Sequence, residues 1–304
     1  MRLRPRQKLF VDRSLAALGA HGNTLGIAPT GAGKTIMLSA VTGELIGDSA
    51  AKACVLAHRD ELTDQNRDKF ARVNPGLTTS VVDASAKAWA GQVTFAMVPT
   101  LARIGNLAAM PQLDLLVIDE AHHAVAASYL RIIDHVRNAN PDARIFGVTA
   151  TPNRGDKTGL REVFDNVADQ VRLGELIASG HLVPPRTFVI DVGVQDKLRT
   201  VRKSLADFDM AEVASIMDRA PVTDEVIRHW KEKAGDRQTV VFCSTVAHAA
   251  HVTAAFNAAD VPAGLIHGDL LRDNHLGRCR QPPWPVGLNG RRACPSGGQP
   301  HRPD

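Results

Sequence analysis

The sequence has few cysteines and no long apolar run, and both shortages exclude classes of protein. Its 304 residues include four cysteines, Cys54, Cys243, Cys279 and Cys294, whose spacing matches no metal-binding pattern. We interpret Cys54 and Cys243 as buried thiols in a reducing cytoplasm. No run reaches the roughly 18 apolar residues that a membrane span requires, and residues 1–6 lack the apolar core of a signal peptide. We therefore expect a cytoplasmic chain with no membrane partner.

The overall composition is that of a globular chain with a mild excess of positive charge. Hydrophobic residues make up 44 % of the sequence and charged residues 22 %, and the formal net charge is +4. Such a small excess permits a polyanionic partner without requiring one. The length is enough for two ordinary domains and a tail.

The stretch Ala-Pro-Thr-Gly-Ala-Gly-Lys-Thr at residues 28–35 organises the chain. The apolar run 24–27 before it predicts a buried strand, and residues 36–41 after it predict the start of a helix. Gly31 and Gly33 allow the backbone to curl until successive N–H groups point at one anion. Because the helix N-terminus adds partial positive charge there, the pattern predicts a phosphate-binding loop.

Two side chains of this loop carry specific roles. Lys34 reaches the β- and γ-phosphates of a nucleotide, and the Thr35 hydroxyl binds Mg²⁺. The usual pattern opens with glycine where this chain has Ala28, a minor departure because only the inner glycines need unusual backbone angles. The alternative is a chance glycine-rich turn. The predicted nucleotide-binding residues of the loop are Thr30, Gly31, Ala32, Gly33, Lys34 and Thr35.

A second acidic site follows another buried strand. Residues 113–118 are apolar apart from Asp114, and Asp119-Glu120-Ala121-His122 comes directly after them. An Asp at this strand end can hold Mg²⁺ through water, and the Glu that follows can deprotonate an attacking water. We therefore predict Lys34, Asp119 and Glu120 as catalytic residues. The alternative is that the two carboxylates cap the next helix.

Two further stretches can face the same crevice. Residues 145–148 predict a strand that ends in Thr149-Ala150-Thr151-Pro152, which places two hydroxyls where open α/β sheets bind ligands. About 25 residues before the loop, Gln7 can offer adenine a paired donor and acceptor. For most of the basic side chains around it we favour a solvated face; these are Arg2, Arg4, Arg6, Lys8 and Arg13.

Together these stretches resemble a superfamily 2 helicase of the DEAH-box type, and more narrowly the type III restriction enzyme (Res subunit)-like helicases of bacteria and phages. The matches are 28–35 with motif I, 55–62 with Ia, 97–101 with Ib, 119–122 with II and 149–152 with III. Residues 4–7 resemble the Arg-Pro-x-Gln element that recognises adenine in this family. The resemblance covers about residues 1–272.

The resemblance implies an α/β fold and a function. It implies a RecA-like P-loop NTPase lobe with a parallel sheet at 1–183, an incomplete second RecA-like lobe at 184–275 and an irregular tail at 276–304. It implies ATP and Mg²⁺, with ATP hydrolysis driving movement on nucleic acid, DNA in preference to RNA, by a monomer. It implies Arg59 and Thr100 as nucleic-acid contacts, and it implies coupling of ATP state to domain motion by His122, Thr149 and Thr151.

The second half of the sequence carries weaker patterns. The stretch from Leu173 to its stop at Gly180, and the face formed by Val222, Val226 and Trp230, predict helices. The runs 187–192, 239–243 and 264–266 predict strands. Residues 277–304 hold six of the 17 prolines and contain no Ile, Phe, Lys or Glu, so no element is predicted there. We interpret that stretch either as a disordered basic tail or as the product of a reading-frame change after about Asp273.

The tail bears on activity. The sequence lacks motifs V and VI of the family that it resembles, which end in arginines that reach the γ-phosphate. We therefore expect this chain to bind ATP but to hydrolyse it barely above background. The alternative function is a nucleotide- and nucleic-acid-binding module without motor activity. A P-loop kinase for small molecules is disfavoured by residues 119–122 and 149–152.

Overall fold

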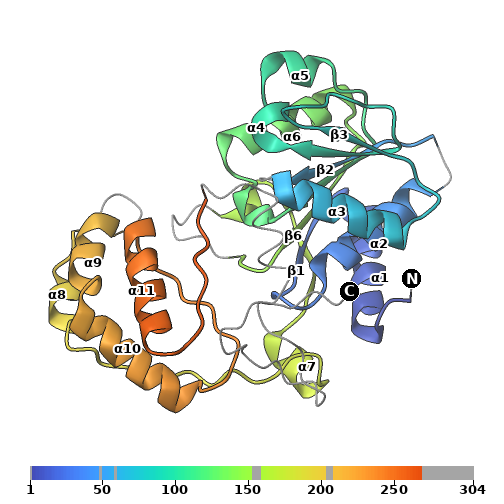
Figure 1. The fold of residues 1–304 in the computed structure, drawn as a ribbon. Helices are drawn as coiled ribbons and strands as arrows, with labels where there is room; N and C mark the ends of the chain where they lie inside the picture. Colours follow the sequence, from blue (N-terminus) through green and yellow to red (C-terminus); the bar gives the residue numbers. More distant parts are fainter. Residues whose placement is uncertain (1, 48–49, 58–59, 153–158, 203–207, 269–304) are drawn as a thin grey trace, which may run out of the picture. The chain divides into compact units, whose positions relative to one another are not determined.

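A computed structural model of the protein describes residues 2–47, 50–57, 60–152, 159–202 and 208–268. Contacts divide the chain into two units, Met1–Pro185 and Arg186–Asp304, drawn in Figure 1. The sequence places the boundary of the first lobe at residue 183. The tail at 276–304 and residue Arg59 lie outside the described residues.

The first unit is built on a seven-stranded parallel sheet in the order β3-β4-β2-β5-β6-β1-β7. The strands are β1 (Asn23–Ile27), β2 (Ala53–Ala57), β3 (Thr79–Val82), β4 (Val93–Met97), β5 (Leu115–Asp119), β6 (Arg144–Thr149) and β7 (Val167–Gln170). This architecture confirms the predicted α/β fold with a RecA-like lobe. Asp119 pairs with Val148 and Ile27 with Thr149, so the carboxyl ends of β1, β5 and β6 meet at one edge.

Helices cover both faces of the sheet (Figure 1). On β2, Cys54 and Leu56 belong to one apolar cluster and Val55 to the other, because successive side chains of a strand point to opposite faces. The first cluster includes α4 (Val98–Leu101), α5 (Ile104–Ala108) and α6 (Ala127–Ala139); the second includes α1 (Pro5–His21), α2 (Lys34–Ile46) and α3 (Asp60–Val73). Short helices η1 (Ala121–His123), η2 (Leu160–Glu162) and α7 (Leu173–Ala178) complete the unit. Burial on both faces explains why the strand sequences are continuously apolar.

The solvated face favoured for most of the N-terminal basic residues does not describe Arg6, which is only partly exposed, whereas Arg13 is exposed although it also has a carboxylate partner. Both donate to the carboxylate of Asp169 on β7, which is 7 % exposed, and the Arg13 Nη1 contact measures 2.8 Å. Arg6 also donates from Nε to Glu175 Oε2 at 2.8 Å. Burial acts to raise the pKa of Asp169, but the hydrogen bonds from Arg6 and Arg13 hold that pKa below its ordinary value. This network fixes α1 against β7 and α7, and so fixes the residues that α1 presents to the phosphate loop.

The described part of the second unit contains four helices, α8 (Gln195–Arg199), α9 (Met210–Met217), α10 (Ala220–Lys233) and α11 (Val246–Ala258). Ile227 of α10 packs with Val252 and Phe256 of α11. Trp230 meets the Phe256 ring edge-on, with centroids 5.6 Å apart. The helix predicted from the face at positions 222, 226 and 230 is therefore confirmed.

The strands predicted at 187–192, 239–243 and 264–266 are wrong for the described residues, which form no strand in this unit. A strand obtains its backbone hydrogen bonds from neighbouring strands, and the described residues of this unit offer these segments no such neighbour. Several of their apolar side chains are consequently exposed; Val189 is 97 % and Phe242 93 % exposed. Cys54 is buried as predicted, whereas Cys243 is only half-buried.

None of the helices in the described residues combines the length and the apolarity that crossing a membrane requires.

Candidate nucleotide site

The loop between β1 and α2 has the backbone shape that its glycines were expected to allow. Gly31 has φ +88° and Gly33 has φ +87°, both in the left-handed region. A Cβ at Gly31 would lie 2.7 Å from Leu182 Cδ2, and one at Gly33 would lie 2.5 Å from Gln7 Nε2. Both positions therefore favour glycine for their backbone conformation, while the atoms that a Cβ would meet are the ends of flexible side chains. α2 begins at Lys34, so its first N–H groups open into this loop.

The acidic site lies beside the phosphate loop. Lys34 Nζ is 3.8 Å from Glu120 Oε1, and both side chains are partly exposed. The two residues are 86 positions apart in sequence. They meet because β1 and β5 both pair with β6, and the carboxyl ends of the three strands lie at the same edge of the sheet. Lys34, Asp119 and Glu120 are thus brought together, as a nucleotide hydrolysis site requires.

Glu120 and the residues predicted to couple ATP state to motion form a connected set. Glu120 has φ +50°, a left-handed conformation that non-glycine residues rarely adopt and that clusters at functional sites. His122 Nδ1 lies 3.3 Å from Glu120 Oε2 and 3.2 Å from Thr149 Oγ1. The Thr151 N–H donates to Thr149 Oγ1 at 3.1 Å. The contacts run from Glu120 to the end of β6; the coupling role of His122, Thr149 and Thr151 stays a prediction.

Asp119 is held by two donors, one of which the sequence did not indicate. Its Oδ1 accepts from the Glu120 N–H at 3.0 Å, and its Oδ2 accepts from Asn66 Nδ2 at 2.9 Å. Asn66 lies on α3 and is buried. It belongs to none of the predicted motifs. Its partner is 53 residues away in sequence, and a local sequence pattern cannot indicate a contact over that separation.

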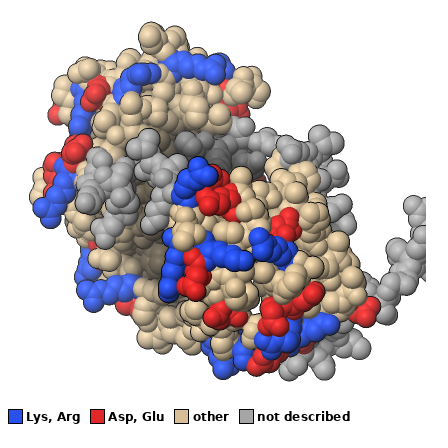
Figure 2. Space-filling view, turned by 90° about the vertical axis from the view of Figure 1, so that its left-hand side faces the viewer, with Lys and Arg blue, Asp and Glu red and all other residues tan. Residues whose placement is uncertain are grey.

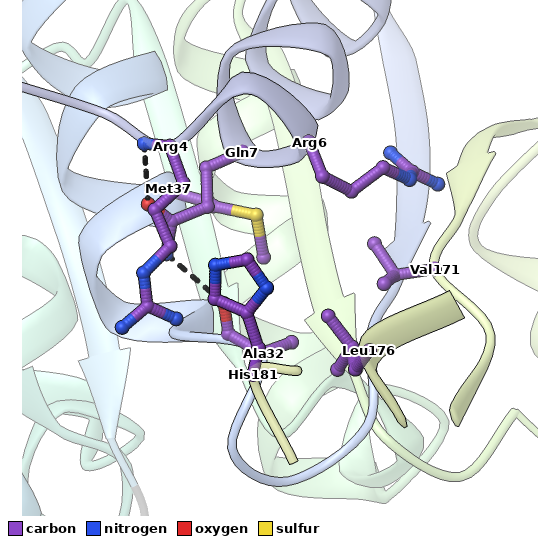
Figure 3. A pocket seen from close by; sticks show the side chains of 8 residues that line it. All are labelled: Arg4, Arg6, Gln7, Ala32, Met37, Val171, Leu176 and His181. Carbon is purple, nitrogen blue, oxygen red and sulfur yellow. Dashed lines mark hydrogen bonds between the residues drawn. The ribbon is translucent and has the colours of Figure 1, made fainter. Parts of the chain in front are cut away.

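Gln7 occupies the wall of a small pocket next to the loop, shown in Figure 3. Its Nε2 donates to the Ala32 carbonyl at 3.0 Å, and its Oε1 accepts from the Arg4 N–H at 3.1 Å. An amide has two donor and two acceptor positions, so one of each stays available to a ligand. The other lining residues are Arg4, Arg6, Ala32, Met37, Val171, Leu176 and His181; of these, Met37, Val171, Leu176 and His181 carried no predicted role.

The remaining predicted residues differ in accessibility. Thr30 and Gly31 are exposed at the loop tip, and Thr35 is half-buried in the first turn of α2. Thr100 is 3 % exposed, with its carbonyl accepting from Asn106 Nδ2 at 2.7 Å. Its side chain therefore offers little surface here, and its contact with nucleic acid stays a prediction.

Charges of both signs are mixed on the described part of the face shown in Figure 2. Figure 2 shows Lys and Arg side chains interspersed with Asp and Glu over the described part of the face that it presents. On this face the small net charge of +4 does not gather into one continuous basic field.

Comparison with known proteins identifies the family. Residues 1–154 match the family described as "Type III restriction enzyme, res subunit". The chain belongs to this family. The family is part of superfamily 2, the helicase group, and two relatives of the chain are named as ATP-dependent helicases. The Res resemblance expected from the motifs is thereby confirmed.

Two yeast relatives support this placement. The chain is 25 % identical over 291 residues to "Putative ATP-dependent helicase IRC3" of Saccharomyces cerevisiae, covering 90 % of this chain and 42 % of that protein. It is 27 % identical over 310 residues to "Putative mitochondrial ATP-dependent helicase irc3" of Schizosaccharomyces pombe, covering 95 % and 49 % respectively. The Res-family chain spans about half the length of the curated relatives it matches.

Among solved structures, the type ISP restriction-modification enzyme LlaBIII bound to DNA is similar in fold. The TM-score is 0.56 at 14 % identity, covering 86 % of this chain and 21 % of that enzyme. At this identity the likeness shows the fold alone.

Proposed function

We propose that this chain binds MgATP at residues 30–35 and uses ATP hydrolysis to act on nucleic acid, DNA in preference to RNA. The observation that carries the proposal is the 3.8 Å approach of Lys34 Nζ to Glu120 Oε1, in a lobe whose family hydrolyses ATP. The cytoplasmic location and the monomeric state expected from the sequence stay predictions.

The residues at the shared sheet edge fit a nucleotide with its metal ion. The left-handed Gly31 and Gly33 give the loop the curled backbone that can turn successive N–H groups toward one anion. Asp119 and Thr35 supply the oxygen ligands that Mg²⁺ prefers. Bound there, Mg²⁺ would neutralise charge on the β- and γ-phosphates. Asp119 would hold it through water and Thr35 through its hydroxyl.

The protein's own groups account for the rest of the chemistry. Loop N–H groups and Lys34 bind the phosphates, which holds the γ-phosphoryl group in line with an attacking water. Glu120 accepts the proton of that water as general base. His122, 3.3 Å from Glu120 Oε2, orients the carboxylate. Gln7 presents its free donor and acceptor to the adenine edge in the pocket of Figure 3.

Binding to nucleic acid is tested by its dependence on salt. Because Lys and Arg contacts release counterions from phosphates, the affinity for a DNA oligonucleotide should fall steeply between about 50 and 200 mM salt. Arg59→Ala should weaken binding to all sequences alike and reduce the salt slope by about one. Fluorescence anisotropy at several salt concentrations measures both effects, with RNA of the same sequence as the comparison.

Arg72→Ala is the matched control, since Arg72 is exposed at the other end of α3 and its loss changes the net charge equally. The control should leave the salt slope within error of wild type. Affinity that ignores salt, or an equal effect of both variants, would refute the backbone contact at Arg59.

The alternative function is a nucleotide- and nucleic-acid-binding module without motor activity. The observation that supports this alternative is that the described residues of the second unit form no strand. ATP turnover measured with and without DNA separates the two functions, because DNA should stimulate ATP hydrolysis only in a motor that moves on it.

A further inference from the structure

Asn66 is the one buried amide that contacts the acidic site in the described residues. It lies in the first half of α3 and is 2 % exposed. Its Nδ2 donates to Asp119 Oδ2 at 2.9 Å, a contact without which the amide would be buried at a cost of about 1–3 kcal/mol. The burial and the distance together make this a defined contact rather than a surface encounter.

The contact fixes how Asp119 presents its oxygens. Oδ1 accepts from the Glu120 N–H at 3.0 Å and Oδ2 from Asn66, so each oxygen is held by one uncharged donor. A carboxylate has about four lone-pair sites, which leaves a site on each oxygen for water.

α3 does not need Asn66 for its own attachment. Phe70 is fully buried and meets the Phe95 ring edge-on at 5.6 Å, and Asn74 Nδ2 donates to the Ser39 carbonyl at 2.8 Å. Both contacts secure the helix to the lobe one and two turns further along. The Asn66 amide is therefore placed for Asp119 rather than for the packing of the helix.

We propose that Asn66 is a positioning residue for Asp119, holding the carboxylate in the orientation in which it binds the water shell of Mg²⁺. The inference rests on the proposed function of Asp119. Partners that orient a metal ligand typically contribute 10–100-fold to metal affinity or activity. The Asn66 contact also links α3, which begins directly after the predicted nucleic-acid contact Arg59, to the metal-binding carboxylate.

The test measures how nucleotide binding depends on Mg²⁺. Asn66→Leu keeps the size of the side chain and removes the donor. With a fluorescent ATP analogue, the Mg²⁺ concentration at half-maximal binding should rise about 10–100-fold. Binding measured in EDTA should stay within about twofold, a split that a general loss of structure would not produce. Should Asn66→Leu fail to fold, Asn66→Ser removes the reach of the amide with a smaller change and should shift the Mg²⁺ dependence in the same direction.

Two further variants separate the possible failures. Asn74→Leu makes the same substitution directly after the end of α3 and should leave the Mg²⁺ dependence unchanged. Asp119→Asn removes the proposed metal-binding group and should shift the dependence at least as far as Asn66→Leu. A shift in Asp119→Asn with none in Asn66→Leu or Asn66→Ser would overturn the role of Asn66 alone. Nucleotide binding that does not depend on Mg²⁺ in wild type, or an unchanged Mg²⁺ dependence in Asp119→Asn, would overturn the proposed function and this inference with it.

Discussion

Lys34→Ala is expected to remove MgATP binding while leaving the fold intact. Lys34 is the side-chain cation of the phosphate loop, and it has the β- and γ-phosphates to bind. Hydrogen bonds to charged groups contribute about 1.5–3 kcal/mol each, so losing two should weaken binding by about 10²–10⁴. The side chain belongs to neither apolar cluster of the lobe, so the thermal unfolding temperature without nucleotide should stay close to that of wild type. Isothermal titration calorimetry with MgATP measures the affinity.

Lys69→Ala serves as the control, because Lys69 is an exposed lysine of α3 in the same unit. It should bind MgATP as wild type does. An unchanged affinity in Lys34→Ala would mean that residues 28–35 form an ordinary glycine-rich turn, the alternative that the sequence left open.

Glu120→Gln should separate ATP binding from ATP hydrolysis. A general base acts on the attacking water rather than on the nucleotide, so the affinity should stay within a few-fold of wild type. Turnover should fall by about 10²–10⁴. The amide keeps the size of the carboxylate, and so preserves packing beside Lys34 and His122. Single-turnover hydrolysis of radiolabelled ATP with excess protein measures the rate in both proteins.

Glu44→Gln makes the same chemical change at an exposed position of α2 and should not alter hydrolysis. Equal turnover in Glu120→Gln and wild type would mean that Glu120 is not the general base and has only a structural role after β5.

The first lobe could be predicted because its signals are local. A glycine-rich loop between an apolar strand and a helix determines its own backbone shape, and the positive φ values of Gly31 and Gly33 were expected from residue type alone. β7 was not predicted, because Val167–Gln170 is a short edge strand of mostly exposed residues, with only Asp169 buried. The Asn66–Asp119 contact was missed because it depends on tertiary packing.

The second unit shows the opposite case. Residues 187–192 and 239–243 are rich in β-branched and aromatic residues, a composition typical of strands. This composition indicates how well a segment fits into a sheet. Forming a strand also requires a neighbouring strand to accept its backbone hydrogen bonds. Val189 and Phe242 are almost fully exposed in the structure, so the local preference is present and the partner strands are not among the described residues.

The central claim is that the loop at residues 30–35 binds a nucleotide through its phosphates. Titrating the wild-type chain with ATP, ADP and AMP in the presence of Mg²⁺ tests it most directly, because AMP keeps the base and loses the β- and γ-phosphates. We predict that ADP, which keeps only the β-phosphate, binds more weakly than ATP, and that AMP binds at least about 100-fold more weakly than ATP, as expected for the loss of charge-assisted contacts. AMP bound as tightly as ATP would contradict it.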